Sequence, residues 1–176
     1  MWRPAGRRRG GVPGDRSRHG AQRRQRPCPR AGAVTTVTNP ARPLPTPTDL
    51  TRPFWAGLAE GALRLQRCVE CGHLRNPIAT VCPECLSADH AWEQVSGLGT
   101  VFSTIVFHQV YNEAFATDVP YNVSIVELDE GPHVLSNVVG KPPGEVRVGD
   151  RVRVVLTEVA PGVTIHQFRP DGDGAA

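Results

Sequence analysis

The sequence of 176 residues is poor in aromatic side chains and has no long hydrophobic run. Aromatic residues make up 6% of the chain, and methionine occurs once. No stretch of about 18 consecutive apolar residues occurs, which excludes an ordinary transmembrane helix. The arginines near the N-terminus are not followed by an apolar segment, so we expect no secretory signal peptide and a cytoplasmic location.

Familiar catalytic motifs are also missing. The chain has no G-x-S-x-G, no phosphate-binding glycine loop and no H-E-x-x-H. Its six histidines are scattered, and Cys28, the one cysteine outside the paired motifs, lies in a segment that we expect to be disordered. We therefore predict no catalytic residues and no enzymatic activity from the chain alone.

Acidic residues are scarce at the N-terminus, where the positive charge is concentrated. Residues 1–40 hold ten of the 20 basic residues and one of the 17 acidic ones, which leaves ten and 16 in residues 41–176, a net charge of −6. The Arg/Gly/Pro-rich composition of 1–40 predicts a disordered tail. The tail is open to four interpretations: a basic arm for nucleic acid, a transit peptide, a solvated tail, or translation from a start codon assigned upstream of Val34 or Val37.

Residues 41–63 combine a proline-rich extended approach with a short aromatic helix. Thr51 is a predicted N-cap, and Pro53 suits the first helical turn. Phe54, Trp55, Leu58 and Leu63 supply an apolar face. Because so short a helix is marginal alone, we expect this face to dock either on the rest of the chain or on a partner protein.

From residue 93 onwards the pattern is that of a mainly β fold. Short segments rich in β-branched and aromatic residues alternate with Gly, Pro and Asp turn signals. Five such segments predict a small Greek-key barrel of the OB type over residues 93–170, followed by a disordered tail at 171–176. The predicted strands are 99–109, 122–128, 133–139, 151–159 and 164–169.

Four cysteines between the helix and the strands have the spacing of a metal site. Cys68, Cys71, Cys82 and Cys85 form two C-x2-C pairs separated by ten residues. Two such turns can direct four thiolates at one zinc ion in tetrahedral geometry. Since four sulfur ligands leave no open position, we predict a structural zinc ribbon over residues 64–92. Iron, as a rubredoxin-like centre or a cluster, and a pair of disulfides are the alternatives.

One interruption of the strand pattern, residues 110–121, contains three aromatic residues. Tyr111, Phe115 and Tyr121 lie close together in the sequence, in a predicted loop between barrel strands. Aromatic residues in a long loop can form a ligand surface or a docking patch. Packing of the loop on its own side chains explains the pattern equally well.

The order of these motifs is specific when taken as a set. The set consists of Phe54-Trp55, Cys68-x2-Cys71-Gly72, Cys82-Pro83-x-Cys85, Gly99-Thr100-Val101, Pro120-Tyr121 and Val148-Gly149-Asp150-Arg151-Val152. With these motifs in this order, residues 45–170 resemble the OB-fold proteins with an N-terminal rubredoxin-like zinc ribbon, a former domain-of-unknown-function family associated with acyl-CoA. Arg75-Asn76-Pro77 departs from the aromatic-Pro or Pro-Pro sequence that this resemblance leads us to expect in the ribbon.

This resemblance implies an accessory role. Members of the family are similar in working beside thiolase-like enzymes or aldolases of lipid, steroid or acetoacetyl-CoA metabolism, where the small subunit completes or bridges the acyl-CoA site. The expected partner surface then consists of Phe54, Trp55, Tyr111, Phe115 and Tyr121. Nucleic-acid binding is the alternative function, because OB barrels and ribbons both serve it.

Overall fold

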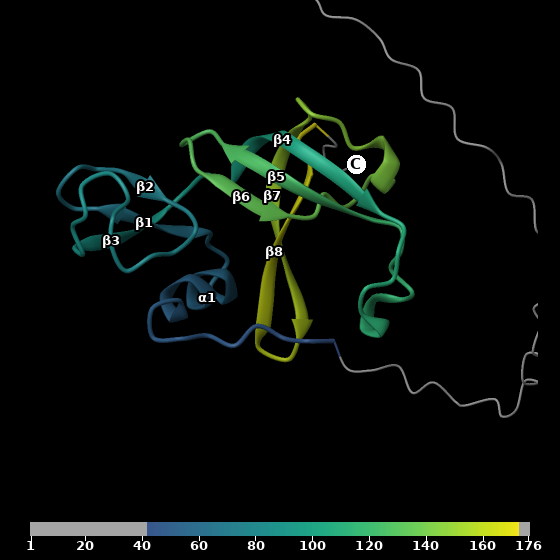
Figure 1. Cartoon of the computed structure of the whole chain (residues 1–176), viewed down its shortest axis with the longest axis horizontal. Coiled ribbons are helices and arrows are strands. Elements are labelled where there is room, and N and C mark those ends of the chain that lie inside the picture. Colours follow the sequence, from purple (N-terminus) through teal and green to yellow (C-terminus); the bar gives the residue numbers. More distant parts are fainter. Residues whose placement is uncertain (1–41, 173–176) are drawn as a thin grey trace, which may run out of the picture. The chain divides into compact units, whose positions relative to one another are not determined.

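The computed structural model describes residues 42–172 (Figure 1). Within them, no helix combines the length and the apolar character needed to cross a membrane. The α-helix is α1 (Arg52–Ala59), and two 3-10 helices, η1 (Glu113–Phe115) and η2 (Pro143–Glu145), lie in loops. The strands are β1 (Arg64–Cys68), β2 (Leu74–Arg75), β3 (His90–Gln94), β4 (Leu98–Phe107), β5 (Tyr121–Leu128), β6 (His133–Ser136), β7 (Arg151–Ala160) and β8 (Val163–Pro170).

Helix α1 docks on its own chain. Phe54 and Leu58 are buried in the core, and the helix contacts β8 and β1. Thr51 is the N-cap residue, but the prediction of a side-chain cap is wrong. The backbone of Thr51 has helical angles (φ −98°, ψ −10°), and its hydroxyl instead accepts a hydrogen bond of 2.9 Å from the N–H of Thr48.

The ribbon sheet has the strand order β2-β1-β3, with antiparallel pairs. Gln66, at the centre of β1, is fully buried, and its side-chain amide forms hydrogen bonds with groups on both sides of the strand. Its Oε1 accepts from Arg75 Nε (2.9 Å) and from the N–H of Ala79 (3.0 Å), and its amide nitrogen lies 3.0 Å from His90 Nε2. This buried amide therefore joins both outer strands and the following loop.

The second sheet is a nearly closed five-stranded antiparallel barrel with the order β6-β5-β4-β7-β8. An isolated parallel bridge between Val138, two residues beyond β6, and Phe168 of β8 brings the two edges of the sheet together. The predicted mainly β fold with an OB-type barrel is confirmed. Strand β6 ends at Ser136, three residues earlier than predicted. There the chain leaves the β5 ladder, and the side chain of Asn122 binds the N–H (2.8 Å) and C=O (2.7 Å) of Val138 in its place.

One continuous hydrophobic core joins α1, the ribbon and the barrel. Leu65 and Leu74 of the ribbon belong to the same buried cluster as Val126 and Phe168 of the barrel. Trp92 and Ile78, also from the ribbon, pack against it. The ribbon is thus part of the fold rather than an appendage.

Candidate metal centre and neighbouring surfaces

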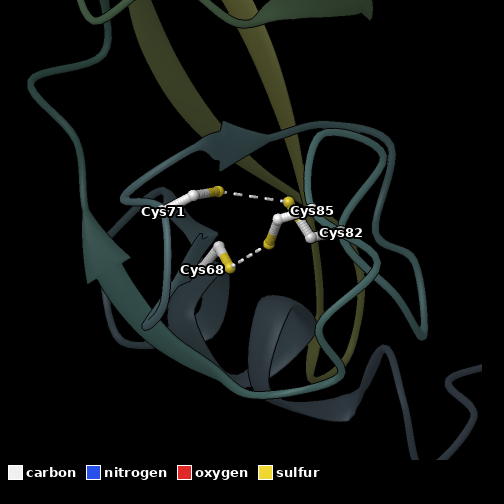
Figure 2. Close-up of side chains that lie close together, drawn as sticks. All are labelled: Cys68, Cys71, Cys82 and Cys85. Carbon is white, nitrogen blue, oxygen red and sulfur yellow. Dashed lines mark hydrogen bonds between the residues drawn. The ribbon is translucent and has the colours of Figure 1, made fainter.

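The four paired cysteines converge on one point. Figure 2 shows their side chains directed toward one another from the end of β1 and from the two loops that follow. The sulfur atoms of Cys68 and Cys85 lie 3.5 Å apart, those of Cys71 and Cys82 lie 3.6 Å apart, and all four lie within 4.8 Å of one another.

These separations fit a single metal ion. A disulfide requires about 2.05 Å between sulfurs, and the four cysteines are free thiols. Four sulfurs at about 2.3 Å from a tetrahedral zinc ion lie about 3.8 Å apart. The disulfide alternative is therefore wrong for these residues, and the four cysteines form one group that could hold a metal ion.

The two cysteine turns have the same backbone geometry. The N–H of Gly72 donates to the C=O of Cys68 (3.0 Å), and the N–H of Leu86 donates to the C=O of Cys82 (2.9 Å). Both donors have a left-handed backbone, with φ +74° at Gly72 and φ +63° at Leu86. Glycine adopts this conformation freely, whereas leucine does so at a cost. Sequence reasoning identified Gly72 but not the strained Leu86.

The four thiols differ in pKa, which is lowered at Cys68 and Cys82 and raised at Cys71 and Cys85. The backbone N–H of Cys71 lowers the pKa of Cys68 to about 6. For Cys82, burial opposes ionisation, yet the N–H groups of Cys85 and Glu84 outweigh it and lower the pKa. The N–H of Ser87 favours the Cys85 thiolate, but the neighbouring thiols of Cys68 and Cys71 raise its pKa to about 12. A cation at the centre of the group would remove this competition, since it stabilises every thiolate.

The aromatic residues in and beside the loop of residues 110–121 form two separate groups. The rings of Phe107 and Tyr121 are stacked with centroids 5.4 Å apart, and Tyr111 meets Phe107 edge-on at 5.8 Å. Phe115 lies apart from them, beneath the guanidinium of Arg42 at 5.4 Å. Sequence reasoning missed Phe107, because it was assigned only to a strand, and Arg42, because its partner lies far away in the sequence.

A pocket of about 530 Å³ opens beside this loop. Phe115 and Tyr121 line it together with segments from β5, β8 and the β6–η2 loop. Two cations also line it, each with a carboxylate partner: Arg42 lies 2.7 Å from Asp118, and Lys141 lies 2.8 Å from Asp150. The volume is within the range of small-molecule sites.

The two aromatic residues of α1 differ in exposure. Phe54 is 7% exposed and meets His166 of β8 edge-on at 5.6 Å, so it packs in the core of its own chain, the first of the two docking alternatives. Trp55 is half-buried and lines a second pocket of about 320 Å³ with Pro77 and Leu135. Whether the five aromatic residues contact a partner stays a prediction.

The fold and the site define a class: a rubredoxin-like metal ribbon followed by an OB barrel. Residues 55–91 match the family model described as "ChsH2, rubredoxin-like zinc ribbon domain", and residues 92–157 match "ChsH2, C-terminal OB-fold domain". The chain belongs to this ChsH2 family, also known as DUF35.

Relatives with known names support the assignment. The chain is 36% identical over 94 residues to a "DUF35 domain-containing scaffold protein" of Methanothermobacter thermautotrophicus, covering 53% of this chain and 70% of that protein. It is 38% identical over 118 residues to a "Probable enoyl-CoA hydratase alpha subunit" of Thermomonospora curvata, covering 66% of this chain but only 36% of the hydratase subunit.

A solved structure is similar along nearly its whole chain. A chain of the "Ltp2-ChsH2(DUF35) aldolase" superimposes with a TM-score of 0.66 and 34% identity. The match covers 72% of this chain and 98% of that one.

Proposed function

We propose that this chain is a non-catalytic accessory subunit that binds a thiolase-like acyl-CoA enzyme and helps to form or bridge its acyl-CoA site. The likeness to the Ltp2-ChsH2(DUF35) aldolase carries the proposal, because it extends over 98% of that chain at 34% identity. The name of the hydratase alpha subunit also points to acyl-CoA chemistry. Lipid or steroid acyl-CoA metabolism in the cytoplasm is the setting we propose.

The metal in this proposal is a structural zinc ion held by the four cysteines. Four sulfur ligands exclude water and substrate from the coordination sphere, so the ion supplies folding free energy rather than catalysis. Metal analysis of the purified protein should give one zinc per chain. A red protein with visible absorption would instead show iron.

The acyl-CoA contact is the second part of the proposal. The 530 Å³ pocket offers aromatic surface from Phe115 and Tyr121 beside the cations Arg42 and Lys141. Such a combination suits an elongated ligand with an apolar part and phosphate groups. Phe115→Ala and Lys141→Ala should therefore raise the KM of the assembled enzyme for acyl-CoA without preventing assembly.

The first experiment is recovery of the partner. The chain, tagged at its C-terminus, is expressed in its own host, and proteins recovered in near-stoichiometric yield are identified by mass spectrometry. The proposal requires an acyl-CoA enzyme whose activity with its acyl-CoA depends on adding the purified chain. Recovery of nuclease-sensitive nucleic acid without such an enzyme would favour the alternative function.

A further inference from the structure

Three neighbouring strands of the barrel, β4, β5 and β6, expose an apolar outer surface. They lie side by side in Figure 1. Their register places large apolar side chains next to one another on the side facing away from the core. We call this surface the outer apolar face; it consists of Phe102, Ile105, Phe107, Tyr121, Val123, Ile125 and Leu135.

The face is unusually apolar for a sheet surface exposed in the isolated chain. Antiparallel sheets normally turn polar side chains outward, yet Phe102 is 53% exposed, Ile105 57% and Leu135 64%. The outward positions of the three strands include one carboxylate, Glu127, and no lysine or arginine. A contiguous exposed patch of this kind marks an interaction surface.

Ring contacts position aromatic side chains at both ends of the face. A bulge between Val101 and Ser103 turns Phe102 outward, where its ring lies 4.5 Å from that of His133 across the intervening strand. Tyr121 stacks on Phe107 at the other end. Rigid aromatic side chains lose little entropy on binding, which suits them as interface anchors.

The other segments of the chain are poor candidates to cover this face. Residues 1–41 supply only Met1, Trp2 and three valines as large apolar side chains, and residues 173–176 supply none. Nucleic acid is disfavoured because the face presents no cation to phosphate. The remaining occupant is an apolar protein surface.

We infer that the outer apolar face is the docking site for the acyl-CoA enzyme; this inference rests on the proposed function. The names of similar proteins describe them as parts of larger assemblies, an enoyl-CoA hydratase alpha subunit and the ChsH2(DUF35) component of an aldolase. Two residues of the face, Tyr121 and Val123, also line the 530 Å³ pocket. A partner bound on the face therefore lies at the edge of that pocket, where both chains can contact one ligand.

The test uses single charge insertions at exposed positions. Ile105→Glu and Leu135→Glu place a carboxylate in the face without disturbing the core, because both side chains are more than half exposed. Val148→Glu is the matched control, since Val148 is 66% exposed but lies in the loop before β7. Zinc content and thermal midpoint should be unchanged in all three variants.

The measurement is the Kd for the purified acyl-CoA enzyme recovered with the wild-type chain. We expect Ile105→Glu and Leu135→Glu to raise the Kd at least about thirtyfold, because an unpaired carboxylate would be buried in an apolar interface, and Val148→Glu to leave it within about twofold. Unchanged binding by both face variants would overturn the docking site while leaving the accessory role intact.

Two further outcomes identify other occupants. If the isolated wild-type chain sediments as a dimer and both face variants sediment as monomers, the face binds a second copy and the inference is wrong. If no acyl-CoA enzyme is recovered at all, the proposed function fails and the docking site fails with it.

Discussion

Loss of one cysteine ligand should destabilise the barrel as well as the ribbon. We predict that Cys82→Ser, at a position fully buried in the structure, leaves the site with three sulfurs and abolishes stoichiometric zinc binding. Without the metal, the cysteine loops have too little core to hold the ribbon sheet. Ribbon unfolding then removes its apolar side chains from the common core.

The size of the effect follows from those side chains. Leu65 is fully buried and Leu74 is 7% exposed, and both belong to the cluster that contains Val126 and Phe168 of the barrel. Exposing a buried leucine costs about 1.5–3 kcal/mol, so the two together cost about 3–6 kcal/mol. Total stabilities of single domains are about 5–15 kcal/mol, so the variant should be marginally folded.

Zinc stoichiometry and urea unfolding measure the two parts of this prediction separately. The control is Cys28→Ser, which removes the cysteine that lies outside both the paired motifs and the described residues. It should retain one zinc and the wild-type unfolding midpoint. Retention of zinc by Cys82→Ser would contradict the four-ligand site. Zinc loss with an unchanged midpoint would contradict the coupling between ribbon and barrel.

Three further changes test local features of the fold. Leu86→Gly should stabilise the protein by about 0.5–1 kcal/mol in urea unfolding, because glycine relieves the left-handed backbone at φ +63°; destabilisation would mean that the exposed leucine side chain makes a needed contact. Asn122→Ala should cost about 2–4 kcal/mol, since it leaves the N–H and C=O of Val138 without their partner at the closure of the barrel; a loss below about 0.5 kcal/mol would show that other groups bind Val138. Asp150→Asn tests pH dependence. The side chain of Lys141 and the N–H of Arg147 lower the pKa of Asp150, so its contribution is complete above the unfolded value of about 3.9 and declines as the pH falls through the lower folded pKa. The stability difference between wild type and variant should therefore be constant near neutral pH and shrink in acid; a difference that grows in acid would reverse the assigned sign.

Local chemistry made several elements predictable from the sequence. The convergence of the four cysteines follows from their spacing, because two residues between cysteines set a turn that directs both thiols to one side. The barrel strands follow from β-branched residues bounded by turn signals. In contrast, the end of β6 depends on the Asn122 side chain, which binds the backbone of Val138, 16 residues away in the sequence, in place of the ladder.

The burial of Phe54 and the contacts of Arg42 depend on long-range packing, which the local sequence does not determine. A buried Phe54 and an exposed Phe54 have the same local sequence, and only contact with β8 distinguishes them. Arg42 likewise meets Phe115 and Asp118 across more than seventy residues. The set of residues that line the 530 Å³ pocket could therefore not be predicted from the sequence, because the approach segment and the loop meet only in the folded chain.

The outer apolar face depends on a single backbone irregularity. Strict alternation along β4 from the buried Val101 would place Ser103, Ile105 and Phe107 on the core side. The bulge after Val101 adds one residue, so Thr104 faces inward and its hydroxyl accepts from Ser124 Oγ at 2.9 Å. Ile105 and Phe107 consequently face outward, beside Val123 and Tyr121 of β5. A one-residue shift reverses the two sides of a strand, and here it exposes the apolar residues on which the proposed docking depends.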